Sequence, residues 1–252
     1  MTLTYLFIFI LGAVIGSFLN VCIYRLPAQQ SVITPPSNCP NCHTPIRFYD
    51  NMPILSFLLL RGRCRTCGTP ISAQYILVEI LNGAGYMLII WKFGLSLESA
   101  LYAILFSSLL VASAIDLYHR IIPDVITIPG IIAGLLASAF ILPSGIKDSI
   151  AGTLLGGSIF FIVAVASRGG MGGGDIKLIA MIGAFLGWPN VIITIILSSF
   201  LGSLVGIFMM IFFGKGRKYP VPFGPFLAIG GIISLFFDKE IIGWYLGMNL
   251  WN

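Results

Sequence analysis

The sequence predicts an all-α polytopic membrane protein of about eight transmembrane helices, with one small extramembrane domain between the first and second helices. The composition supports this class, because 58% of the 252 residues are hydrophobic and only 9% are charged. A soluble globular domain carries about 25% charged residues. A transmembrane helix needs about 20 apolar residues and satisfies its own backbone polar groups inside lipid. A soluble enzyme, a disordered chain and a nucleic-acid-binding protein are therefore poor interpretations, and no nucleic-acid partner is expected.

The predicted spans follow the long apolar runs of the chain. The first lacks the basic region that begins a signal peptide, and its apolar run is too long for one, so we expect it to be retained. The organisation is then a first helix at 1–26, a polar domain at 27–73 and a membrane domain at 74–252. We expect spans at 3–24, 74–92, 98–117, 124–142, 148–167, 175–188, 191–213 and 221–237, with a tail or interfacial helix at 241–251.

The placement of basic residues predicts the orientation of these spans. If the spans alternate across the membrane, 11 Lys and Arg residues lie on one side and 3 on the other. The positive-inside rule makes the richer side cytoplasmic. The N-terminus is then outside, and the domain at 27–73 lies in the cytosol. The richer side holds Arg25, Arg47, Arg61, Arg63, Arg65, Arg120, Arg168, Lys177, Lys215, Arg217 and Lys218.

Two Cys-x-x-Cys pairs in the polar domain indicate a metal site. Such pairs, 21 residues apart here, are typical of zinc proteins, and four thiolates suit a closed tetrahedral Zn²⁺ site. Two disulfides or four free thiols are the alternatives, and a cytosolic location argues against disulfides. Each cysteine pair is expected to form a tight metal-binding turn, or knuckle. Gly68 follows the second pair and His43 the first, so we expect the two knuckles not to be identical. The predicted ligands are Cys39, Cys42, Cys64 and Cys67.

Asp116 and Asp175 stand out among the acidic residues. Both lie at the cytoplasmic edge of predicted spans, where an acid is costly and marks a functional site by default. Asp175 can also cap the helix that it begins. Capping does not explain the three preceding glycines, Gly172, Gly173 and Gly174. These permit close backbone approach, as a bound peptide strand would require.

Other polar residues have simpler interpretations. For Asp124, which follows Pro123, a helix cap is the leading interpretation and a secondary site role the alternative. Glu79 and Asn82 are three residues apart on one helical face. We expect them to face the bundle interior, either as a hydrogen-bonded pair or as part of a pocket.

Two carboxyl groups on separate spans at one depth suggest an aspartic protease pair. Like charges held close cannot both ionise readily, so such a pair shares one proton. The ionised member then takes a proton from water, and the protonated member donates to the scissile carbonyl. The pair titrates as a unit, so the two roles cannot be divided from sequence. The chain contains neither the GxSxG nor the HExxH motif of other hydrolases.

Several motifs together resemble the type IV prepilin peptidases, the bifunctional prepilin leader peptidase and N-methyltransferase family of GxGD-type membrane aspartic proteases. The resemblance covers most of the chain. It rests on the N-terminal motif at 12–27, the cysteine pairs, the runs at 50–56 and 61–64, Asp116 with the run at 122–124, and the run at 172–177.

The resemblance implies an integral enzyme of the bacterial inner membrane. It would cut the short basic leader from type IV prepilins and pseudopilins after glycine, on the cytoplasmic side, in type IV pilus or protein-secretion systems. Asp116 and Asp175 match the family's catalytic pair, and Asp124 an acidic position outside that pair. The glycines at 172–174 and Lys177 are supporting positions.

The bifunctional members also methylate the new N-terminal residue with S-adenosylmethionine. No GxGxG strand–helix fingerprint supports this half of the function. The candidate cofactor residues are Gly16, Asn20, Arg25 and Glu79, although Asn20 can equally make an interhelical hydrogen bond. The alternatives are a GxGD peptidase without methyltransferase activity and, outside the enzymes, a transporter. Against a transporter, the aspartates lie at the membrane edge rather than the midplane.

Overall fold

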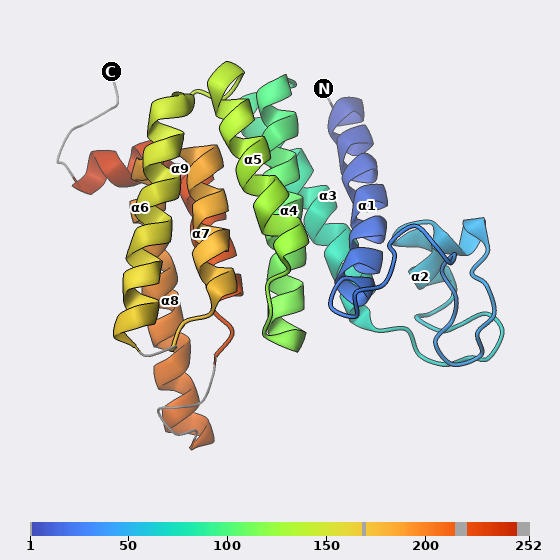
Figure 1. The fold of residues 1–252 in the computed structure, drawn as a ribbon. Helices are drawn as coiled ribbons and strands as arrows, with labels where there is room; N and C mark the ends of the chain where they lie inside the picture. The colour runs from blue at the N-terminus through green and yellow to red at the C-terminus, as the bar shows by residue number, and fades with distance from the viewer. Residues whose placement is uncertain (1, 168–169, 215–220, 246–252) are drawn as a thin grey trace. The chain divides into compact units, whose positions relative to one another are not determined.

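The computed structural model describes residues 2–167, 170–214 and 221–245, and it confirms the all-α class (Figure 1). Each of the eight predicted spans corresponds to a long helix. A 3₁₀ turn, η1 (Phe48–Asn51), and a short helix, α2 (Leu55–Leu59), lie in the cysteine-containing domain. The long helices are α1 (Thr2–Arg25), α3 (Ala73–Phe93), α4 (Leu97–His119), α5 (Asp124–Phe140), α6 (Gly145–Ala166), α7 (Gly173–Leu186), α8 (Trp188–Phe213) and α9 (Gly224–Tyr245).

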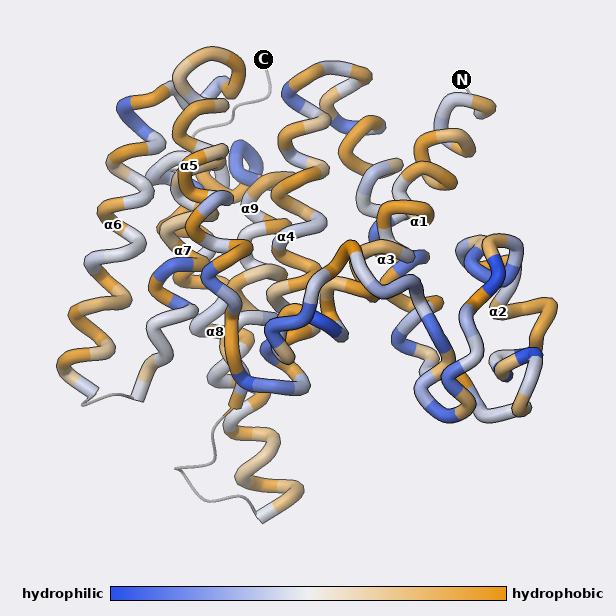
Figure 2. Tube along the Cα trace, turned by 45° about the vertical axis from the view of Figure 1, so that its right-hand side comes forward, coloured by the Kyte–Doolittle hydropathy of each residue, from blue (hydrophilic) through white to orange (hydrophobic). Residues whose placement is uncertain are grey.

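Five of these helices are long and apolar enough to cross a membrane: α1, α3, α4, α6 and α8. Figure 2 shows the hydrophobic colour along most of the helical tube. At 17 residues α5 is shorter, and the 14 residues of α7 span only about 21 Å at 1.5 Å per residue. Since that is less than the ~30 Å hydrocarbon core, α7 is better described as a core helix than as a full span.

The C-terminal region differs in detail from the prediction. Helix α9 continues through a kink at Phe237 to Tyr245, so the start of the stretch expected at 241–251 belongs to α9. The rest of that stretch lies outside the described residues. So do four of the basic residues that set the predicted orientation, namely Arg168, Lys215, Arg217 and Lys218.

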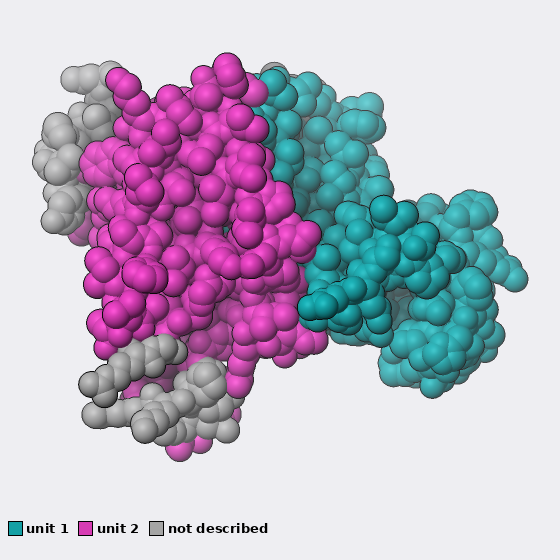
Figure 3. Space-filling view, in the orientation of Figure 1, with its two compact units in different colours: residues 1–111 teal, residues 112–252 magenta. Residues whose placement is uncertain are grey.

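The chain forms two compact units, 1–111 and 112–252, and the division falls inside α4 (Figure 3). In the first unit, α1 packs against α3 through glycines. A Cβ atom at Gly12 would lie 2.8 Å from Gly83 Cα, and one at Gly16 would lie 2.8 Å from Glu79 Cα. Close approach of the two helices requires glycine at both positions.

Buried polar groups also join the helices of the first unit. The side-chain amide of Asn82 donates to the carbonyl oxygen of Gly12 at 2.8 Å and accepts from the Ser107 hydroxyl at 2.9 Å. Glu79 and Asn82 are both buried, as expected for residues that face the bundle interior. They do not form the predicted pair, because the bonds of Asn82 go to Gly12 and Ser107.

The second unit is built around α7. Every residue of α7 from Leu178 to Leu186 is buried, and α5, α6, α8 and α9 all contact this helix. At the crossing with α6, a Cβ atom at Gly183 would lie 2.5 Å from the backbone of Gly152. This packing fixes the N-terminus of α7, which carries Asp175.

Candidate functional site

The second unit brings the two predicted catalytic aspartates together. Asp116 is buried near the end of α4, and Asp175 is half-buried in the first turn of α7. The Asp116 carboxyl group is close enough to act electrostatically on that of Asp175. One oxygen of Asp175, Oδ1, is buried with no hydrogen-bond partner among the described residues. An unpaired buried oxygen is costly, and a shared proton, a water or a substrate would satisfy it.

Gly224 is a site residue that the sequence analysis missed. Its backbone N–H donates to Asp116 Oδ2 at 2.8 Å. A Cβ atom here would lie 2.9 Å from the same oxygen and 3.2 Å from Asp116 Cβ. Gly224 therefore both holds and makes room for the Asp116 carboxylate. The sequence feature that could have drawn attention to Gly224 is its position between Phe223 and Pro225, at the start of a predicted span.

We expect Gly224→Ala to lower the kcat of peptide cleavage about 100-fold, because a misplacement of about 1 Å at a catalytic group can cost that much. The substrate KM should stay unchanged. The matched control is Gly206→Ala in α8, where an added Cβ meets nothing within 4 Å. Steady-state cleavage by the two variants checks the prediction, and equal activities would contradict it.

The glycine run before Asp175 has a different local role at each position. Gly172 is the N-cap residue of α7, with extended backbone angles. An added Cβ meets nothing within 4 Å at Gly173, whereas at Gly174 it would lie 2.8 Å from Ile122 Cβ. Ile122 therefore fills the space beside Gly174, and the role of the three glycines in admitting a substrate strand stays a prediction.

Gly174→Val should lose most cleavage, since overpacking against Ile122 shifts the first turn of α7 and with it Asp175. Gly173→Val, which enters open space, should keep most cleavage. Initial cleavage rates of both variants, with insertion verified by yield and monodispersity, test this difference. Equal losses in the two variants would instead favour direct contact between the glycine run and a substrate strand.

Asp124 is paired rather than capping. Pro123 is the N-cap of α5, with no side-chain cap hydrogen bond, and Asp124 is the first residue inside the helix. Its two carboxylate oxygens accept from Lys177 Nζ at 2.6 and 2.7 Å. The leading interpretation of Asp124 as a cap is therefore wrong. The ion pair links the start of α5 to the first turn of α7, two residues beyond Asp175.

Asp124→Asn should keep cleavage within about fivefold of the wild type. The pair is exposed, with 40% of the lysine side chain and 56% of the aspartate side chain accessible. Such a pair contributes about 0–1 kcal/mol. Cleavage rates measured beside those of Asp116→Asn check this prediction. A hundredfold loss would place Asp124 in the catalytic machinery.

The four predicted zinc ligands converge in the first unit. Their sulfur atoms all lie within 4.8 Å of one another, with 3.8 Å between Cys39 and Cys67 and 4.0 Å between Cys42 and Cys64. A tetrahedron with Zn–S bonds of about 2.3 Å has edges of about 3.8 Å. The cysteines are free rather than disulfide-bonded, and their arrangement fits one zinc ion.

The two knuckles share one backbone conformation despite their different sequences. The backbone N–H of His43 donates to the carbonyl oxygen of Cys39 at 2.9 Å, and that of Gly68 donates to the carbonyl oxygen of Cys64 at 3.0 Å. Both residues have positive φ, 56° and 70°. The expected difference between the knuckles is thus confined to the residue type. His43 carries the strain that a side chain meets in this left-handed region.

Hydrogen bonds to the sulfur atoms favour metal binding. The Thr69 hydroxyl lies 3.2 Å from Cys67 Sγ and, with the Thr69 backbone and Asn41, lowers the pKa of that thiol to about 5. The thiolate is the form that binds a metal.

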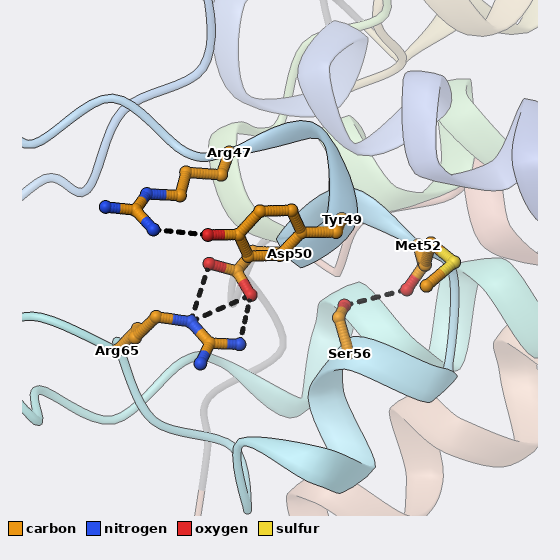
Figure 4. Close-up of polar contacts among 6 residues, drawn as sticks. All are labelled: Arg47, Tyr49, Asp50, Met52, Ser56 and Arg65. Atoms are coloured by element: carbon orange, nitrogen blue, oxygen red, sulfur yellow. Dashed lines mark hydrogen bonds and ion pairs between the residues drawn. The ribbon is translucent and has the colours of Figure 1, made fainter.

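An ion pair ties the second knuckle to η1. Arg65 donates to both oxygens of Asp50 at distances from 2.6 to 3.1 Å, and Arg47 donates to the Tyr49 hydroxyl (Figure 4). The bond from Arg65 lowers the pKa of Asp50. Because the folded pKa is depressed, the stabilisation is present above the usual pKa of aspartate and is lost as the pH falls through the lowered value.

A cavity of about 420 Å³ lies between the cysteine-containing domain, the C-terminal part of α1 and the N-terminal part of α3. Three of the four cofactor candidates line it: Asn20, Arg25 and Glu79. Gly16 does not, since it serves the helix contact described above. Asn20 Oδ1 is buried without a partner among the described residues, which leaves an acceptor for a bound molecule in the wall of the cavity.

Arg25 and Glu79 shape this cavity. The Arg25 guanidinium donates to the carbonyl oxygens of Ser31 and Pro35 at 2.9 and 2.7 Å, and so fixes the loop that follows α1. Glu79 Oε2 accepts from the Ile54 N–H at 2.7 Å. Ile54 has φ of 62°, an outlier for a β-branched residue. Such strain is typical of functional sites.

A carboxyl pair packed among membrane helices is the arrangement that an integral-membrane aspartic peptidase requires. Family models match two parts of this chain: the bacterial peptidase A24 N-terminal domain at 10–93 and the type IV leader peptidase family at 103–207. The chain belongs to the type IV leader peptidase family.

Curated relatives match nearly the whole chain. The prepilin leader peptidase/N-methyltransferase of Stutzerimonas stutzeri is 36% identical over 94% of this chain and 92% of its own length. The enzymes of the same name from Pseudomonas aeruginosa and Legionella pneumophila are 35% and 34% identical, over 94% and 96% of this chain and 91% and 94% of their own lengths. No solved structure matches the chain.

Proposed function

We propose that this chain cleaves the leader of type IV prepilins or pseudopilins and then methylates the new N-terminus. The observation that carries the proposal is the pair Asp116 and Asp175, which interact within one helical unit. The names of the relatives support both activities, and the two matched domains support the peptidase. The transporter alternative is not favoured, because the relatives that match nearly the whole chain are enzymes.

The peptidase chemistry uses the carboxyl pair as one proton-sharing unit. One carboxylate takes a proton from the attacking water while the other carboxyl group donates to the scissile carbonyl oxygen. Asp116 Oδ2 is engaged by the Gly224 N–H, so Oδ1 is the oxygen of Asp116 left to face a reactant. The unpartnered Asp175 Oδ1 supplies the second position.

The methyltransferase half requires a site for S-adenosylmethionine, which supplies an electrophilic methyl group when bound. The cavity lined by Asn20 and Glu79 fits this molecule. Its volume lies in the usual range for small-molecule sites, Glu79 can face a cationic sulfonium or ammonium, and Asn20 Oδ1 can accept from an amino group. Tyr24, Phe57 and Tyr75 line the same cavity and offer aromatic faces for an adenine ring.

The orientation of the chain in the membrane is proposed from the distribution of its basic residues. We place the N-terminus outside and the cysteine-containing domain in the cytosol of a bacterial inner membrane, since the positive-inside rule favours that arrangement. Zinc held by the four cysteines stabilises the domain, and the membrane lipid surrounds the exposed apolar faces of the spanning helices.

A single incubation tests the whole proposal. The purified protein is mixed with a prepilin and S-adenosylmethionine, and mass spectrometry then reads the N-terminus of the product. The expected product has lost its leader after glycine and gained one methyl group of about 14 Da. A product that is cleaved but unmethylated would support the peptidase-only alternative. An uncleaved substrate would contradict the proposal.

A further inference from the structure

A second cavity lies beside the proposed cofactor cavity, in the same unit. It has a volume of about 520 Å³ and forms a groove along one side of α1. Val14 and Phe18 form its wall on α1, and the loop segments that contain Ile33 and Met52 form the opposite wall. We name it the α1 groove.

The wall of the α1 groove on α1 carries two exposed apolar side chains. Val14 and Phe18 are 50% and 51% exposed on a helix that is long and apolar enough to span the bilayer. An apolar chain can therefore enter the groove directly from lipid, without first crossing water.

The groove meets the cofactor cavity at a polar wall. Ser17, Val21 and Arg25 line both cavities. The Ser17 side chain lies near Glu79, whose side chain lines the cofactor cavity alone. A group that reached the inner end of the groove would therefore lie beside Ser17, next to the carboxylate of Glu79.

We propose that the α1 groove binds the methyl acceptor, the first apolar residues of a cleaved pilin, and presents their free amine to the cofactor cavity. This inference rests on the proposed methyltransferase function. The substrate has the two properties that the groove selects: an apolar segment that lies in lipid and a basic amine at its end. The amine must lose a proton before its nitrogen can form a bond to the methyl carbon, and Glu79 is placed to receive that proton. The bond between sulfur and the methyl group would break in the same step, and S-adenosylhomocysteine would leave.

Arg25 positions one wall of the groove. Its guanidinium holds the Ser31 and Pro35 carbonyl oxygens, and the chain from Val32 to Ser37 follows along the groove. This assigns Arg25, first considered as a cofactor ligand, to the shape of the acceptor site.

Site-specific photocrosslinking tests whether the groove is occupied, independently of any activity. A photoreactive phenylalanine analogue replaces Phe18, or, as a control, Leu77 of α3, which is 55% exposed and lines neither cavity. The probe is a synthetic cleaved pilin segment in detergent micelles. We expect a crosslink to its first residues from position 18 and none from position 77. Equal crosslinking, or crosslinks from position 18 to detergent alone, would overturn the proposal.

A kinetic test uses a variant that fills the groove. Val14→Trp should raise the KM for methylation of the cleaved segment about tenfold, which corresponds to the loss of one well-buried apolar contact. The affinity for S-adenosylmethionine and the rate of leader cleavage should not change. Ile10→Trp, at a position one helical turn away that is 52% exposed, is the control. An unchanged KM in Val14→Trp would contradict the groove assignment.

The two tests separate this inference from the function on which it rests. A crosslink from position 18 in a protein that methylates nothing would sustain the binding site and refute the methyltransferase. Methylation by the wild type without any crosslink from position 18 would sustain the methyltransferase and refute the binding site in the α1 groove.

Discussion

Asp116→Asn and Asp175→Asn should each lower the rate of leader cleavage by about 10²–10⁴-fold, the contribution of a general acid or base. Each substitution removes one carboxyl group from a pair that must share a proton. An amide has nearly the same shape, so the packing around either position is preserved. Initial rates of cleavage of a purified prepilin give the measurement.

The same variants carry their own folding control. The proposed methylation site belongs to the first unit, whereas both aspartates belong to the second. We therefore expect Asp116→Asn and Asp175→Asn to methylate such a substrate at the wild-type rate. Cleavage at a near-normal rate by either well-inserted variant would rule out the catalytic assignment.

The second large effect concerns the metal. The double variant Cys39→Ser with Cys42→Ser should lose its zinc, and methylation should fall at least tenfold. Structural zinc sites contribute about 10–16 kcal/mol of binding free energy in small domains. Cys39 and Cys64 line the cofactor cavity, so loss of the metal also removes a wall of that cavity.

Metal analysis and initial rates of methylation together measure this effect. The wild type, purified without chelators, should contain about one zinc per chain, and the double variant none. Cys22→Ser is the matched control, because Cys22 is a free cysteine of α1 outside the metal cluster. Absence of zinc from the wild type would contradict the site.

The fold and the residues at the ends of its helices could be predicted largely from local sequence. Apolar runs set the helices, and paired cysteines set the metal cluster. Asp116 and Asp175 could be singled out because acids are rare in this chain. Their electrostatic interaction is a tertiary property. Their common depth at the edge of two predicted spans suggested the pair before the structure did.

The contacts that could not be predicted from the sequence join segments that lie far apart in the chain. Gly224 lies 108 positions from Asp116, and no local pattern marks a glycine whose N–H binds a carboxylate. The Asp124–Lys177 pair overturned a capping interpretation that was reasonable from position alone. The cavities depend on how the loops after α1 fold back, which Arg25 fixes through backbone carbonyl oxygens that carry no sequence signal.

We propose that one chain holds two separate active sites, for cleavage in the second unit and for methylation in the first. The direct measurement is mass spectrometry of the pilin N-terminus after reaction with Asp175→Asn or Glu79→Gln, a glutamine whose amide oxygen can still accept from the Ile54 N–H. We predict that Asp175→Asn leaves prepilin uncut but methylates cleaved pilin. We predict that Glu79→Gln cuts prepilin and leaves the product unmethylated. Joint loss of both activities in either folded variant would contradict the assignment of two separate sites.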